Sequence, residues 1–177
     1  RINRKRLDLK KPQVDEVTQV GTARGVLYKA GSWDCTGLQD FQRNQYLNLF
    51  GDTRNSALWC NLELVEPEDY PSVDTWEPLN ALYDNGNEGN VSYYNSKFIV
   101  DNVVNYHLFI LAFHVIDNGN KNEFIGIKNK TKEGTDDAKM FFVPWDLDTS
   151  LGGEFDGSKY GGNYSMTAIK SMKINQN

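Results

Sequence analysis

The most apolar stretch of the chain, Phe98–Ile116, is long enough for a helix of several turns. Scattered Asp, Asn and His residues interrupt it and exclude a membrane span, because its longest unbroken apolar run is Leu108–Phe113. We expect Ser96 or Asp101 to cap this helix and the helix to end near Ile116. Since it is apolar on nearly every side, we predict that it is central and buried.

Directly after this helix, the sequence predicts a polar loop, a hairpin and a second acidic loop. The first loop, Asp117–Asn122, is rich in the Asn and Gly that favour turns. Two β-like runs, Glu123–Lys128 and Lys139–Val143, follow with a charged loop between them, which predicts a β-hairpin. The second run leads into Pro144–Gly153. Carboxylates that flank one hairpin in this way can face the same cavity.

Upstream of the apolar stretch, shorter patterns complete a mixed order of strands and helices. Two strands are expected at Val17–Val20 and Gly25–Lys29, joined by a turn over residues 21–25. Apolar residues at helical spacing predict a helix over Gly37–Phe50. A strand should follow at Asn61–Val65, and a helix capped by its first residue at Asp74–Asp84. The fold class is therefore α+β.

Composition and charge narrow the class of protein further. The 177 residues carry a net charge of -5 and are 39% hydrophobic, which is a globular composition and gives no general attraction to nucleic acid. We divide the chain into a basic N-terminal arm (1–16), one main domain (17–153) and a Gly-rich, weakly ordered tail (154–177). Because the chain begins with Arg, we expect it to be a piece of a longer protein, and no targeting signal or oligomeric state can be read from it.

Four polar residues around the predicted hairpin supply the groups that a metal-assisted phosphoryl transfer needs. Asp117 and Asn122 fit the pattern D-x-x-x-x-N, in which the Asp accepts the proton of a substrate hydroxyl and the Asn binds metal. Asp146 and Asp148 add carboxylate oxygens, so that the set suits Mg²⁺. Trp145 is expected beside this site, because Pro144 stiffens the approach to it.

Each of these signals has a plainer interpretation. Asp117-Asn-Gly-Asn is also a good turn sequence. Asp146 and Asp148 equally fit a loop cap, or a Ca²⁺ site together with Glu154 and Asp156. The combination of a buried helix, D-x-x-x-x-N, a hairpin and P-W-D-L-D is what favours the functional interpretation.

These residues also carry a family resemblance. The stretch Val104–Gly153 resembles the spore-coat-protein-H kinases (CotH kinases), whose members have a hydrophobic helix, an Asp in an Asn-rich loop, a strand pair and P-W-D-[LMF]-D. Upstream, Gly25–Lys29 is similar to the family's G-N-L-Y-K segment, with Val26 in place of the Asn. The resemblance covers roughly residues 20–155. It implies an atypical protein-kinase-like fold with a helix-rich C-terminal lobe, short hairpins and, in this chain, an incomplete N-terminal lobe.

The resemblance also implies roles for the site residues. Asp117 would orient and deprotonate the acceptor hydroxyl, and Lys29 would contact the ATP phosphates with Glu63 or Glu66 as its ion-pair partner. The implied metal ligands are Asp146, Asp148 and Asn122. The implied cofactors are ATP and Mg²⁺, with Ca²⁺ as the alternative cation. The implied substrate is a protein hydroxyl, and the implied setting is extracytoplasmic or at the surface of a bacterial cell.

A second class of function stays open. Only 28 residues precede Lys29, fewer than the strands that cover the nucleotide in the family would need. The chain is also rich in Asn, Gly and aromatic residues. These features fit a non-catalytic surface module that binds carbohydrate or calcium, a pseudokinase, or a kinase fragment without activity.

Overall fold

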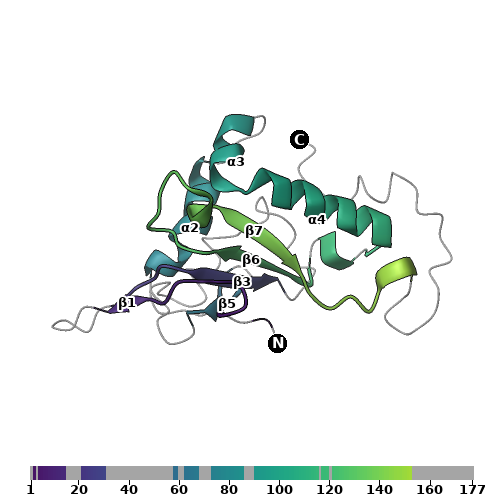
Figure 1. Cartoon of the computed structure of the whole chain (residues 1–177), viewed down its shortest axis with the longest axis horizontal. Helices are drawn as coiled ribbons and strands as arrows, with labels where there is room; N and C mark the ends of the chain where they lie inside the picture. The colour runs from purple at the N-terminus through teal and green to yellow at the C-terminus, as the bar shows by residue number, and fades with distance from the viewer. Residues whose placement is uncertain are drawn as a thin grey trace.

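The computed structural model describes residues 2, 4–14, 21–30, 58–59, 62–67, 73–85, 90–115, 117–119 and 121–152. Its main feature is an antiparallel sheet in the order β4-β5-β3-β6-β7. The strands are β3 (Val26–Ala30), β4 (Leu58–Trp59), β5 (Leu62–Glu66), β6 (Glu123–Ile127) and β7 (Met140–Pro144). With the helices of the described residues on and around it (Figure 1), this sheet makes the protein α+β, as predicted.

The central strand β3 is buried on both faces. Val26, Tyr28 and Ala30 point into the larger core, whereas Leu27 joins a smaller core on the opposite face. Leu9 of the N-terminal segment packs into that smaller core. The prediction of a strand here is confirmed, and the near-continuous apolar run reflects a strand covered on both sides.

A short strand pair replaces the turn expected next to β3. Strand β1 (Gln13–Val14) pairs with β2 (Gly21–Thr22). The prediction of a turn beginning at Gly21 was therefore wrong, because the ladder to β1 extends Gly21 and Thr22. The expected strand Val17–Val20 and the expected helix Gly37–Phe50 lie outside the described residues.

Helix α2 (Val73–Asn85) packs on the larger core, close to the predicted range. Its Trp76 stacks on Tyr28 of β3 with ring centroids 5.3 Å apart, and the Tyr28 hydroxyl donates to the Thr75 carbonyl. Asp74 lies in the first turn of the helix and accepts the Ala23 N–H at 2.7 Å. The expected helix is confirmed, but it begins at Val73, so Asp74 lies inside the first turn and its carboxylate bonds the segment between β2 and β3.

The predicted long helix is present as α4 (Val100–Phe113), but its N-cap is Ile99 instead of Ser96 or Asp101, and a separate short helix, α3 (Val91–Lys97), precedes it. The break has a physical cause at the outer edge of β7. The Ile99 N–H donates to the Met140 carbonyl at 2.9 Å, and the Asn102 side chain bonds both backbone groups of Phe142. The chain leaves helical geometry at Phe98–Ile99 because these backbone groups of an edge strand would otherwise stay unpaired.

The prediction that this helix is buried all round was also wrong. Within α4, Tyr106 and Ile110 are buried, whereas Val104, Leu108 and Phe113 are exposed. Figure 1 shows why: α4 lies along one side of the sheet and contacts it over β7. Over the described part of the chain, no helix has the length and apolar character needed to cross a bilayer.

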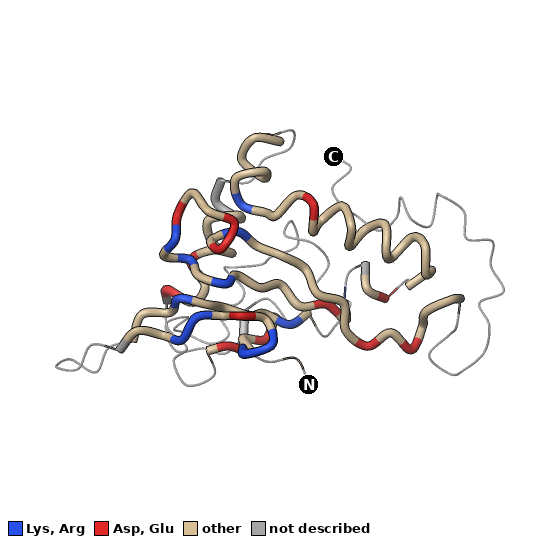
Figure 2. The backbone as a smooth tube through the Cα atoms, viewed as in Figure 1, with Lys and Arg blue, Asp and Glu red and all other residues tan. Residues whose placement is uncertain are grey.

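The predicted hairpin is confirmed as β6 and β7, paired from Glu123 opposite Pro144 to Ile127 opposite Met140. Its two ends differ. One end carries the loop over residues 128–139, which holds charges of both signs. The other end meets the segments that contain the candidate site (Figure 2).

Candidate functional site

Two segments far apart in the sequence meet at one end of the β6–β7 hairpin. A 3₁₀ turn, Asp117–Gly119, follows α4, and Asn122 then leads into β6. On the other side, β7 ends at Pro144 and the chain continues through Trp145. The Trp145 N–H donates to the Asn122 carbonyl at 2.8 Å. The hairpin thus continues for one more hydrogen bond beyond its strands and brings the two candidate loops together.

The side chain of Asn118 provides a second connection. Asn118 is fully buried, and its Nδ2 donates both to the Asn122 carbonyl and, at 2.7 Å, to the Trp145 carbonyl. The Tyr106 hydroxyl of α4 in turn donates to the Asn118 carbonyl at 2.7 Å. Asn118 therefore joins the loop to the end of the hairpin through its side chain, and to the helix through its backbone carbonyl.

Asp117 lies at the start of this loop and is mostly buried. Its carboxylate forms an ion pair with Lys121 at 2.9 Å, four residues along the chain. The two side chains are 16% and 22% exposed, so the pair is shielded from much of the solvent. A carboxylate fixed in this way has a defined position next to the hairpin.

The three predicted metal ligands differ in their surroundings. Asn122 is buried, whereas Asp146 and Asp148 are exposed. Asn122 and Asp146 both have left-handed backbone angles, with φ of 54° and 55°. Non-glycine residues adopt this conformation uncommonly, although Asn and Asp tolerate it best, and such residues cluster at functional sites.

Among the residues that the structure describes, no three His, Cys, Asp or Glu side chains gather closely enough to hold a metal ion by themselves. The two segments nevertheless meet at the same end of the hairpin, where the Trp145 N–H donates to the Asn122 carbonyl. The assignment of Asn122, Asp146 and Asp148 as metal ligands therefore stays a prediction.

Lys29 of β3 reaches the same end of the sheet. Its Nζ lies 4.2 Å from the centroid of the Trp145 ring, a cation–π contact, and Trp145 packs edge-on against Phe124. Lys29 is opposite Glu63 in the β3–β5 register, but the described residues show no ion pair between Lys29 and either Glu63 or Glu66. The lysine is held by an aromatic ring instead of by the expected glutamate.

A half-buried acid, Glu123, lies beside these residues at the first position of β6. Burial raises the pKa of the Glu123 carboxyl to about 8, and a hydrogen bond with Tyr106 acts in the opposite direction. The same environment, together with the charge of Glu123, holds the pKa of the Tyr106 hydroxyl far above its ordinary value. Near neutral pH, Glu123 is therefore largely protonated and adds little negative charge to the site.

Sequence reasoning missed three residues here: Asn118, Lys121 and Glu123. Lys121 had a detectable signal, since an Asp and a Lys four positions apart can pair within one turn. Glu123 was counted only as the first residue of a strand. Asn118 had no signal, because an Asn between an Asp and a Gly is typical of any turn.

This arrangement defines an α+β protein in which two loops that carry acidic and amide residues meet at one end of a hairpin, beside a lysine from the central strand. The family model described as CotH kinase protein matches residues 8–175. The chain therefore belongs to the CotH kinase family, which confirms the resemblance and indicates a kinase-like function. No curated protein matches the chain.

Proposed function

We propose that the protein transfers the γ-phosphoryl group of ATP to a protein hydroxyl, with Mg²⁺ as the cation and a protein-kinase-like arrangement of the site. The observation that carries this proposal is the link between the two candidate loops. Asn122 and Trp145 are joined backbone to backbone at 2.8 Å, next to the candidate ligand Asp146. Residues 117–122 and 144–148 therefore flank one short stretch of hairpin.

The donor set fits a magnesium–nucleotide complex. Mg²⁺ prefers oxygen ligands and is usually bound by one or two carboxylates together with waters and substrate phosphates. Asp146 and Asp148 offer exposed carboxylates, and Asn122 offers an amide oxygen. A cluster of three acids is not needed for such a site. When bound, the cation would neutralise charge on the phosphates.

The remaining residues would act on the reactants directly. Asp117 would accept the proton of the substrate hydroxyl, since its carboxylate is fixed by Lys121. Lys29 would contact the phosphates, and its cation–π contact with Trp145 keeps its ammonium group at this end of the sheet. Lys121 would add a second positive charge next to the transferred group.

The proposal extends to the setting of the reaction. A protein substrate is consistent with a kinase family. An extracytoplasmic or cell-surface location is our prediction from the resemblance, as is the division into an arm, a main domain and a tail at residues 16 and 153.

The test is phosphate transfer from labelled ATP to a generic protein acceptor and to the protein itself. Asp117→Asn and Asp146→Asn should each lower the rate, by about 10²–10⁴ for loss of the general base. Asp136→Asn is the matched control, because Asp136 is 72% exposed in the loop at the opposite end of the hairpin. Full activity in both site variants would rule out the proposed roles.

Thermal melts distinguish the alternative of a non-catalytic module. A ligand at 100 times its dissociation constant stabilises the folded state by about 2.7 kcal/mol. A higher melting temperature with Mg-ATP supports the kinase. A shift with Ca²⁺ or glycans, and none with Mg-ATP, would instead favour a binding module.

A further inference from the structure

Asn118 occupies the point where three parts of the site meet. We infer that Asn118 is a positioning residue for the magnesium–nucleotide site, an inference that rests on the proposed function. Its side-chain amide fixes the backbone at Asn122 and Trp145 and thereby sets how the ligands Asn122 and Asp146 face one another.

The geometry of the amide carries this inference. Both Nδ2 bonds end on backbone carbonyls, one in each loop: the first on Asn122 and the second on Trp145, 2.7 Å away. Asn122 is itself a candidate ligand, and Trp145 directly precedes another, Asp146. A shift of the amide would therefore move both sides of the proposed site together.

The backbone at these positions needs such support. Asn122 and Asp146 both have positive φ, which costs free energy for residues other than glycine unless the surroundings hold it. The Asn122 carbonyl, in the peptide unit that follows Asn122, accepts from both the Trp145 N–H and the Asn118 amide. The Trp145 carbonyl, in the peptide unit that precedes Asp146, accepts from the Asn118 amide. Tyr106 completes the support by donating to the Asn118 carbonyl.

The acceptor oxygen of the same side chain differs from its donor nitrogen. Asn118 Oδ1 is buried and has no hydrogen-bond partner among the described residues. An unpaired buried acceptor is costly, and such groups in native proteins call for an explanation. Among the described residues, the side chain therefore acts only as a donor, and both of its bonds go to the two loops.

The chain offers a matched control in Asn129. It is also fully buried, and its Oδ1 accepts from the Thr131 N–H and hydroxyl just after β6. It therefore has the same residue type and burial as Asn118 but lies beyond the opposite end of the strand. Asn129→Ala should destabilise the protein through the same kind of loss without disturbing the proposed site.

The experiment compares Asn118→Ala with Asn129→Ala in the full chain. In the ligand-free proteins, hydrogen exchange measures protection of the Trp145 amide. Titration calorimetry then measures the affinity for Mg²⁺ with a non-hydrolysable ATP analogue, and labelled ATP gives kcat and KM. Since outer residues that orient metal ligands typically contribute 10–100-fold in affinity or activity, we expect a loss of about that size in Asn118→Ala alone. Its Trp145 amide should exchange faster, whereas Asn129→Ala should match the wild type in amide exchange, affinity and kcat/KM.

Several results would overturn the inference. An unchanged affinity and kcat/KM in Asn118→Ala would do so, as would unchanged protection of the Trp145 amide or an equal loss of affinity in Asn129→Ala. If the wild type binds no Mg²⁺-analogue complex, the proposed function fails and the inference fails with it, which the wild-type titration alone reveals. If Asn118→Ala does not fold, Tyr106→Phe decides: weaker binding by more than about 2-fold supports positioning, and wild-type binding refutes it.

Discussion

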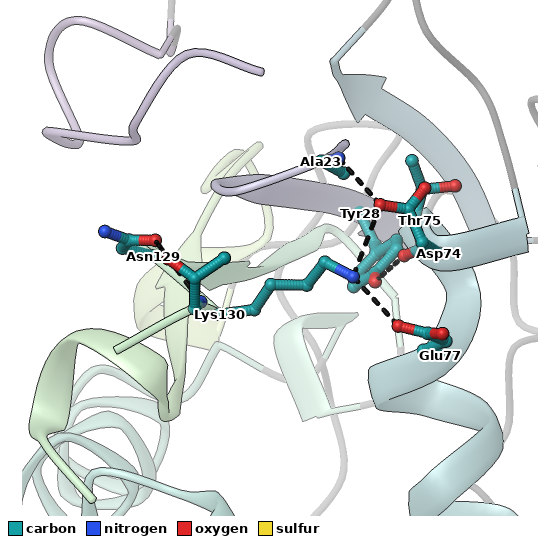
Figure 3. Close-up of polar contacts among 8 residues, drawn as sticks. Ala23, Tyr28, Asp74, Thr75, Glu77, Asn129 and Lys130 are labelled. Carbon is teal, nitrogen blue, oxygen red and sulfur yellow. Dashed lines mark hydrogen bonds and ion pairs between the residues drawn. The ribbon is translucent and has the colours of Figure 1, made fainter. Parts of the chain in front are cut away.

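Asp74 joins three parts of the protein that are distant in sequence, and its removal should destabilise the fold measurably. Its Oδ2 accepts the Ala23 N–H at 2.7 Å and lies 3.4 Å from the Lys130 ammonium (Figure 3). Lys130 also pairs with Glu77 of the same helix at 2.9 Å. The carboxylate thus fixes the first turn of α2 to the chain before β3 and to the loop after β6.

The structure gives the size of the effect for Asp74→Ala. A hydrogen bond to a charged group contributes about 1.5–3 kcal/mol, and Ala23 is buried, so water cannot replace the lost acceptor. Lys130 keeps Glu77 as a partner, so its charge is not left unpaired. We therefore expect the free energy of unfolding to fall by about 2–3 kcal/mol. For a chain of this size, that corresponds to a melting temperature lower by about 4–12 °C.

Two control variants separate the contributions. Asp74→Asn keeps a side-chain oxygen for the Ala23 N–H and should cost about half as much. Glu77→Gln should cost about 0.5 kcal/mol or less, because Glu77 is 61% exposed. Urea unfolding followed by circular dichroism measures all three. If Asp74→Ala unfolds within about 0.5 kcal/mol of the wild type, or Glu77→Gln costs as much, the reasoning is refuted.

Three further predictions concern the hairpin and the site. In Gly126→Ala, the new Cβ would lie 2.6 Å from the ring of buried Phe141. The free energy of unfolding, measured in urea, should therefore fall by about 1–3 kcal/mol. An unchanged value would mean that the ring moves freely. The pKa of Glu123 is about 8 in the folded protein and near 4.5 ordinarily, so the folded state keeps its proton after the unfolded chain has lost it. The free energy of unfolding should therefore fall as pH rises from about 4.5 to about 8, by on the order of a few kcal/mol. Glu123→Gln should abolish that decline, which urea unfolding at pH 5 and pH 8 measures. A parallel decline in the variant would contradict the prediction. Trp145→Leu removes a cation–π contact worth about 0.5–1 kcal/mol and should weaken Mg-ATP binding about 2–5-fold in calorimetry, whereas wild-type affinity would show that the ring does not orient Lys29.

Local patterns were sufficient for much of the fold. The β3, β5 and hairpin strands and helix α2 were predicted close to their observed ranges, because alternation and helical spacing act over a few residues. The break between α3 and α4 could not be predicted in this way. It depends on Asn102 and Ile99 satisfying the outer edge of β7, about 40 residues further along the chain.

In the candidate site, too, the sequence predicted the residues but not all of their contacts. The sequence predicted Asp117, Asn122, Asp146, Asp148 and Lys29 as its members, and their roles stay predictions. It indicated Glu63 or Glu66 as the partner of Lys29, whereas the side chain lies over Trp145. Backbone register places Glu63 opposite Lys29, but register does not decide where a long flexible side chain ends.

By itself, the order of residues determined which groups are available: an acidic pair of loops, a hairpin between them and the family to which the chain belongs. Tertiary structure decided which of those groups meet. A buried amide at Asn118 connects two loops because both leave a backbone carbonyl facing it in the folded protein. Such a contact depends on the burial and direction of groups 27 positions apart, and no short-range pattern encodes that.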